Sequence, residues 1–133
     1  MEKSIIEGYY KLLPPGILAV VKKHMNSIDN ATADYLCEEL DLFSQKVHTE
    51  AKKNSTIDVY LIKRMIDCFK KLLKSFPQMS ETDRLIISSA VRYFIDTEDA
   101  QCDFKDPFGF DDDLAVLNAA LISTGREKMV VSR

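Results

Sequence analysis

Glycine and proline, the residues that most often interrupt a helix, are scarce in this sequence. Glycine and proline occur four times each among 133 residues, and tryptophan is absent. Apolar and polar residues nowhere alternate over a run long enough to predict a strand, which argues against a sheet. The longest nearly uncharged apolar stretch near the N-terminus, residues 16–21, is far shorter than the roughly 20 residues of a membrane span. We therefore expect no signal peptide and no membrane span.

Cysteine is also sparse. Cys37, Cys68 and Cys102 are odd in number and form no Cys-x-x-Cys pair, which argues against a disulfide framework and a cysteine-rich zinc site. Cys37 and Cys68 fall on apolar helical faces and are expected to be buried, whereas Cys102 lies in a polar segment. This pattern predicts reduced cysteines and a cytoplasmic protein.

The composition is that of an ordinary globular domain. Hydrophobic residues make up 46% and charged residues 29%, with a formal net charge of −3 and a pI near 5.4. We expect one domain over residues 1–126 and a loose tail over 127–133. A weakly acidic chain has no overall attraction for nucleic acid or anionic lipid, so no nucleic-acid partner is predicted.

Apolar residues recur with the helical period almost throughout the chain. The prediction is an all-α bundle of five to six helices, at about residues 4–13, 16–25, 31–52, 56–76, 82–95 and 111–124. The helix near 82–95 is apolar almost all round, which is typical of the central helix of a bundle. Expected helix ends are a capping box from Ser4 to Glu7, N-caps at Ser55 or Thr56 and near Ser80, and Gly125 after the last helix.

The fourth predicted helix has two contrasting faces. Its apolar positions are Leu61, Met65, Phe69, Leu72 and Phe76, and a basic stripe is formed by Lys63, Arg64, Lys70, Lys71 and Lys74. A solvated helix face is the simplest interpretation of the stripe, and a site for phosphate or an acidic partner is the alternative. Because the aromatic residues of this helix face inward, single-stranded nucleic acid is not an expected ligand.

The strongest compositional signal is the acidic segment 96–113. It carries eight carboxylates against one lysine, Lys105. Three interpretations stay open: carboxylates that stabilise helix and loop ends, ligands for Ca²⁺ or Mg²⁺, or a charged docking surface. The spacing does not match an EF-hand loop.

The same segment carries a motif running from Tyr93 to Asp113. The pattern resembles the core of the YkvA-like domain of unknown function, a small helical family of bacteria and plants, at Tyr93, Asp99, Asp103, Phe104, Gly109, Asp112 and Asp113. The loop between the aspartates is polar here and apolar in the family. The resemblance covers about residues 80–121 and implies no activity. It does imply that Asp99, Asp103, Gly109, Asp112 and Asp113 form one motif.

No sequence motif of a known catalytic site is present, and His24 and His48 are isolated. The function predicted first is a non-catalytic binding or adaptor module that docks a protein partner through the 96–113 segment. The alternative is a divalent-metal-binding protein or metal-dependent enzyme, with Ca²⁺ or Mg²⁺ on Asp99, Asp103, Asp112 and Asp113. No other cofactor is expected, and a homodimeric structural bundle is a third hypothesis.

Overall fold

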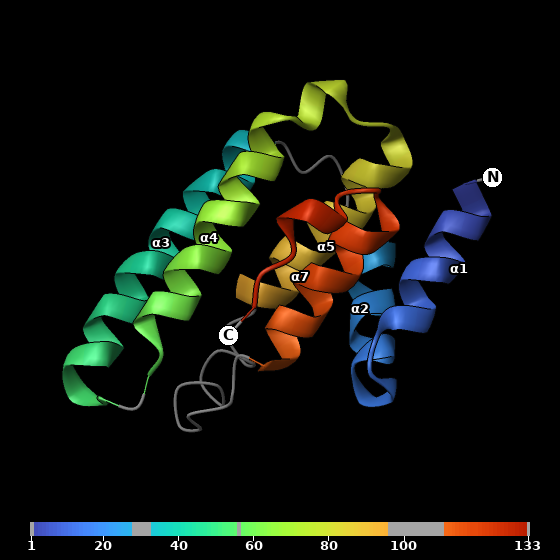
Figure 1. The fold of residues 1–133 in the computed structure, drawn as a ribbon. Coiled ribbons are helices and arrows are strands. Elements are labelled where there is room, and N and C mark those ends of the chain that lie inside the picture. The colour runs from blue at the N-terminus through green and yellow to red at the C-terminus, as the bar shows by residue number, and fades with distance from the viewer. Residues whose placement is uncertain (1, 28–32, 56, 96–110, 133) are drawn as a thin grey trace.

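The computed structural model describes residues 2–27, 33–55, 57–95 and 111–132. These residues form six α-helices and two short 3-10 helices, and no strand (Figure 1). The prediction of an all-α bundle is therefore confirmed. In chain order the elements are α1 (Glu2–Leu12), α2 (Pro15–Ser27), α3 (Ala33–Lys53), α4 (Val59–Lys74), η1 (Phe76–Gln78), α5 (Glu81–Ile95), α7 (Asp111–Ser123) and η2 (Glu127–Met129).

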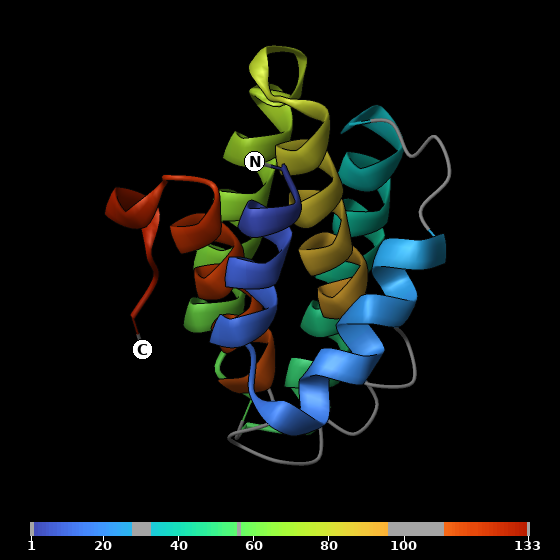
Figure 2. The ribbon, with the colours of Figure 1, turned by 90° about the vertical axis from the view of Figure 1, so that its right-hand side faces the viewer.

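Helix α5 is the centre of the bundle. It packs against α1, α2, α3 and α7. Helices α3 and α4 form an antiparallel hairpin to one side of it, and α1 and α2 lie on the other side, as the two views in Figures 1 and 2 show. Residues on almost every side of α5 are buried, from Ile86 through Val91 to Phe94. This all-round burial agrees with the apolar helix predicted near 82–95.

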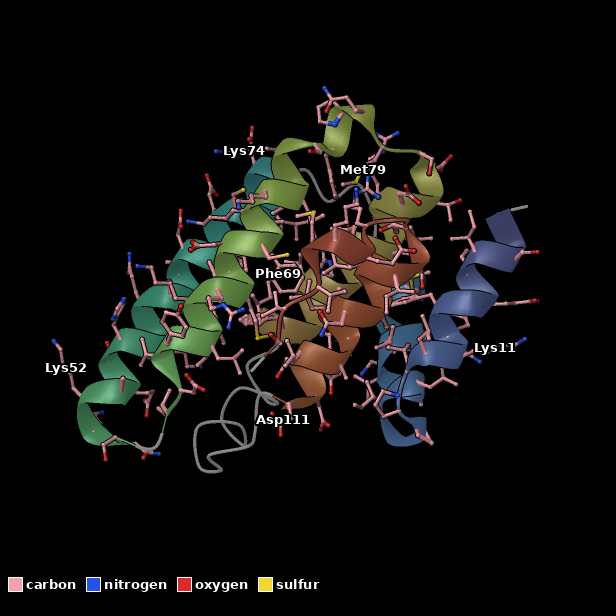
Figure 3. The ribbon with its side chains drawn as sticks, viewed as in Figure 1. Lys11, Lys52, Phe69, Lys74, Met79 and Asp111 are labelled. Atoms are coloured by element: carbon pink, nitrogen blue, oxygen red, sulfur yellow. The ribbon has the colours of Figure 1, made fainter. Side chains whose placement is uncertain are left out.

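Three phenylalanine rings join the α3–α4 hairpin to the central helix. The ring centroid of Phe94 on α5 lies 4.8 Å from that of Phe43 on α3 and 5.3 Å from that of Phe69 on α4. Figure 3 shows Phe69 on the side of α4 that faces α5 and α7. Phe69 and Phe94 are almost fully buried, and each such side chain contributes roughly 1.5–3 kcal/mol through removal from water.

A buried polar contact ties α1 to α5. The Tyr9 hydroxyl lies 3.0 Å from the Ser89 Oγ, and that Oγ donates to the Ile86 carbonyl at 2.7 Å. Because the Ser89 hydroxyl donates its one proton to the Ile86 carbonyl, the Tyr9 hydroxyl must be the donor to the Ser89 Oγ. Tyr9 and Ser89 are both fully buried, so each polar group has the partner that burial requires. The small Ser89 side chain also lets α1 approach α5 closely.

The helix ends partly follow the expected caps. The Ser80 Oγ accepts from the Asp83 N–H at 3.1 Å, and Gly125 adopts a φ of +76° after α7, as predicted. Helix α4 is capped by Asp58, whose Oδ1 accepts from the Leu61 N–H at 2.9 Å, so the expected cap at Ser55 or Thr56 is wrong. Ser4 lies inside α1, which begins at Glu2, so its capping box is also wrong.

The C-terminal segment, defined here as residues 126–132, includes most of the tail expected over 127–133, and it makes specific contacts with two helices. It lies between α7 and α4, and Val131 is only 7% exposed. The Asn118 side-chain amide on α7 donates to the Val131 carbonyl at 2.9 Å and accepts from the Val131 N–H at 3.0 Å. Arg64 on α4 donates to the Ser132 carbonyl at 2.6 Å. These backbone-directed bonds hold the segment in place.

Candidate functional site

The acidic motif is only partly within the described residues. Asp99, Asp103 and Gly109 lie outside them. Asp112 and Asp113 lie on the first turn of α7, where Asp112 is exposed and Asp113 is 2% exposed. The two neighbouring carboxylates therefore meet different environments, one open to solvent and one in the protein interior. The predicted cluster of four aspartates stays a prediction.

Helix geometry accounts for the aspartates at this position. Asp111, Asp112 and Asp113 all belong to the first turn of α7, where backbone N–H groups and the helix dipole stabilise negative charge by about 0.3–1 kcal/mol each. Figure 3 shows Asp111 at the start of this helix. Asp111 and Asp112 are both exposed, so this end of α7 presents negative charge at the surface.

A metal site is not assembled within residues 2–27, 33–55, 57–95 and 111–132. In these ranges, no group of three or more histidine, cysteine, aspartate or glutamate residues is placed to hold a metal ion. A site of the kind predicted for Ca²⁺ or Mg²⁺ would need Asp99 and Asp103 together with Asp112 or Asp113. The metal alternative is thus a hypothesis about the 96–113 segment alone.

A hollow of about 180 Å³ between α3 and α4 brings together the residue types of a hydrolase triad. Ser44, His48 and Asp67 all line it, together with an apolar floor that includes Val47 and Ile62. Nucleophilic catalysis requires the serine, histidine and carboxylate to be linked by hydrogen bonds. Among the described residues, no such bond joins any two of Ser44, His48 and Asp67. Ser44, His48 and Asp67 therefore do not form an assembled hydrogen-bonded triad in this structure.

The basic stripe on α4 lies where the sequence placed it. Lys63, Lys71 and Lys74 are exposed, and Arg64 and Lys70 are half-buried. Lys70 forms an ion pair with Asp41 on α3, and that hydrogen bond raises the pKa of the lysine. Sequence reasoning missed this pairing between helices, because Asp41 is distant in the chain.

The cysteines differ from each other in accessibility. Cys68 is buried as predicted, whereas Cys37 is half-buried, so its predicted burial is wrong. Burial raises the pKa of both thiols, and for Cys37 the nearby Lys70 opposes this effect. A raised pKa leaves less thiolate at neutral pH, which makes both thiols poor nucleophiles. Cys102 lies outside the described residues.

His24 has a neighbour that the sequence did not indicate. Its ring stands edge-on to the ring of Tyr93 on α5, with a centroid distance of 6.5 Å. The side chain is half-buried, so His24 is part of the contact between α2 and α5 and is not an open ligand position. Only a prediction of helix packing could have found this contact.

Comparison with known proteins gives no relative for this chain. No protein-family profile, no curated protein and no solved structure matches it. The resemblance of Tyr93–Asp113 to the YkvA-like domain therefore stays a prediction. Among the helices that the structure describes, none is long and apolar enough to cross a membrane.

Proposed function

We propose that this protein is a non-catalytic binding module that docks a basic protein partner through its acidic segment 96–113. The observation that supports this proposal most directly is the exposure of Asp111 and Asp112 on the first turn of α7. Two of the eight carboxylates of segment 96–113 are thus open to solvent and available to a partner. The proposal includes the YkvA-like motif, in which Asp99, Asp103 and Gly109 belong with Asp112 and Asp113 on the first turn of α7.

The charge of segment 96–113 supports docking of a basic partner. Segment 96–113 has eight carboxylates and one lysine, and crowded carboxylates repel one another unless positive charge lies nearby. A partner surface rich in lysine or arginine would supply that charge, speed up association and select against acidic competitors. The proposed setting is the cytoplasm, and a second copy of the chain is an additional partner to be tested by mass.

A divalent cation is the alternative source of positive charge. In that case Ca²⁺ or Mg²⁺ would bind Asp99, Asp103, Asp112 and Asp113 and make the protein a metal-binding protein or a metal-dependent enzyme. The two hypotheses differ in a simple observable. A bound ion raises the melting temperature by mass action, whereas a docking surface leaves it independent of millimolar Ca²⁺ or Mg²⁺.

The test compares two double variants of equal charge change. Asp99→Asn with Asp112→Asn alters the acidic segment, and the control, Asp34→Asn with Glu38→Gln, alters two exposed positions on α3. Proteins cross-linked to the wild-type chain in cells are quantified for each variant by mass spectrometry. We expect the main cross-linked protein to be lost with the first variant and retained with the control.

Thermal unfolding of the purified protein tests the metal alternative. Melting temperatures are measured with and without Ca²⁺ or Mg²⁺ for the wild type and the Asp99→Asn, Asp112→Asn variant. If the ion raises the melting temperature of the wild type and the variant abolishes that rise, the segment binds metal, and the metal hypothesis is favoured over docking. Equal cross-linking of the two double variants would refute the docking proposal. In the docking case, the complex should also weaken as salt is added.

A further inference from the structure

A cleft of about 410 Å³ lies between α4 and the C-terminal segment. One wall is formed by Arg64, Cys68 and Lys71 of α4, and the other by residues 128–131. Its volume falls within the roughly 300–1,000 Å³ typical of ligand-binding clefts. Because the second wall consists of the docked C-terminal segment, the cleft exists only while Asn118 and Arg64 hold that segment in place.

The charges around this cleft are unbalanced. Arg64 and Lys71 on one wall and Lys128 on the other face a single carboxylate, Asp67. In the part of the chain that the structure describes, none of these three cations forms an ion pair. Arg64 donates to the neutral Ser132 carbonyl and lies over the Tyr60 ring at 5.6 Å, so within the described ranges no carboxylate pairs with it. The cleft is therefore a positive site on an acidic protein.

The remaining lining is apolar. Met129 and Val131 contribute from the C-terminal segment, next to Cys68 of α4. An apolar floor between cations fits a ligand that carries both aliphatic groups and negative charges. No aromatic ring belongs to the described residues that line the cleft, so the stacking platform that single-stranded nucleic acid uses is missing there.

The spacing of the cations selects a peptide over a small anion. Arg64 and Lys71 are seven positions apart on α4, which corresponds to roughly 10 Å along the helix axis. About three residues of an extended peptide span the same length. A phosphate bound beside one of these cations would leave the others without an anionic partner, whereas a peptide with several carboxylates can pair with each of them.

We propose that the cleft between α4 and the C-terminal segment is a second docking site, which binds an acidic, aliphatic peptide segment of a partner protein in extended form. Its carboxylates lie beside Arg64, Lys71 and Lys128, and its aliphatic side chains contact Met129 and Val131. This site is independent of segment 96–113 and opposite to it in charge. Together the two surfaces give the chain the properties of an adaptor between a basic and an acidic partner.

The probe for this site is a fluorescein-labelled peptide that alternates glutamate with valine. Its anisotropy is followed as the full chain is added, with a lysine–valine peptide as the charge control. Saturable binding that weakens with salt is expected for the acidic peptide only. Lys71→Glu and Lys128→Glu should each weaken binding roughly tenfold, because a charge reversal replaces an attraction by a repulsion. Asp67→Asn should tighten binding, since it removes the one opposing carboxylate.

The matched control is Lys74→Glu, which changes an exposed lysine one turn further along α4, outside the cleft. It should alter the affinity by less than about threefold, because an exposed charge that makes no direct contact with the peptide contributes little. Circular dichroism of each variant checks the fold. The proposal is overturned if the acidic peptide does not bind, if Lys74→Glu weakens binding as much as Lys71→Glu, or if millimolar inorganic phosphate or an oligouridine displaces the peptide completely.

Discussion

The docking of the C-terminal segment can be tested through one side chain, Asn118. Its amide forms two hydrogen bonds with the backbone of Val131, at 2.9 and 3.0 Å. Each contributes about 0.5–1.5 kcal/mol net, so Asn118→Ala should lower the free energy of releasing the segment by roughly 1–3 kcal/mol. That difference corresponds to an increase of about 5- to 150-fold in the released population.

Cys68 reports this release without an added label. It is buried beside Met129, with its Sγ 4.0 Å from the Met129 carbonyl oxygen. In a background of Cys37→Ser and Cys102→Ser, the rate at which a thiol reagent modifies Cys68 follows the released population when reclosing is fast. Asn118→Ala should therefore raise the rate by the same factor.

The control for this experiment is Ser132→Ala. Arg64 binds the carbonyl of Ser132 and not its side chain, so this variant should leave the labelling rate unchanged. If Asn118→Ala also leaves the rate unchanged, the two hydrogen bonds do not hold the segment. If both variants accelerate labelling equally, Cys68 is exposed by a motion other than the release of residues 126–132.

Three further outcomes follow from the core, a buried hydroxyl and a helix cap. Phe69→Ala and Ile87→Ala should each destabilise the fold by about 2–5 kcal/mol, since both side chains are buried. Urea unfolding measures this loss, and losses below about 1 kcal/mol at both positions would contradict their core assignment. Burial raises the pKa of Tyr9 above its ordinary value of 10.0, so the folded state keeps this proton when the unfolded state loses it. Stability should thus decline above pH 10 by about 1.4 kcal/mol per pH unit, and Tyr9→Phe should remove that part of the slope in melts recorded at several pH values. Asp58→Ala should cost about 0.5–2 kcal/mol through loss of the α4 cap, and an unchanged melting temperature would show that the cap contributes nothing.

Features that depend on local periodicity could be predicted from the sequence. The buried positions of α4 and the central place of α5 follow from the spacing of apolar residues, because a helix repeats its faces every 3.6 residues. The cap at Ser80 and the turn at Gly125 also follow, since each depends on one residue and its immediate neighbours. The cap of α4 was missed because Asp58, Thr56 and Ser55 are all good caps and only packing selects among them.

Features that depend on contacts between distant segments could not be predicted in this way. Residues 127–133 show no helical or strand period, so nothing local indicated that Val131 would be buried. Its position is fixed by the Asn118 amide and by Arg64, which lies 68 positions away from Ser132. Within the candidate site, the different exposure of Asp112 and Asp113 was likewise hidden, since both carry the same charge on the same helical turn.

The Tyr9–Ser89 hydrogen bond joins residues 80 positions apart, which has a consequence for how the chain folds. The α3–α4 hairpin is closed by a short connection and can form early, because a small loop loses little entropy. Helix α1 can reach α5 only after that long stretch of chain has become compact. We therefore expect α1 to join late in folding. Weakening its contact with α5 should mainly speed up unfolding and leave the folding rate almost unchanged.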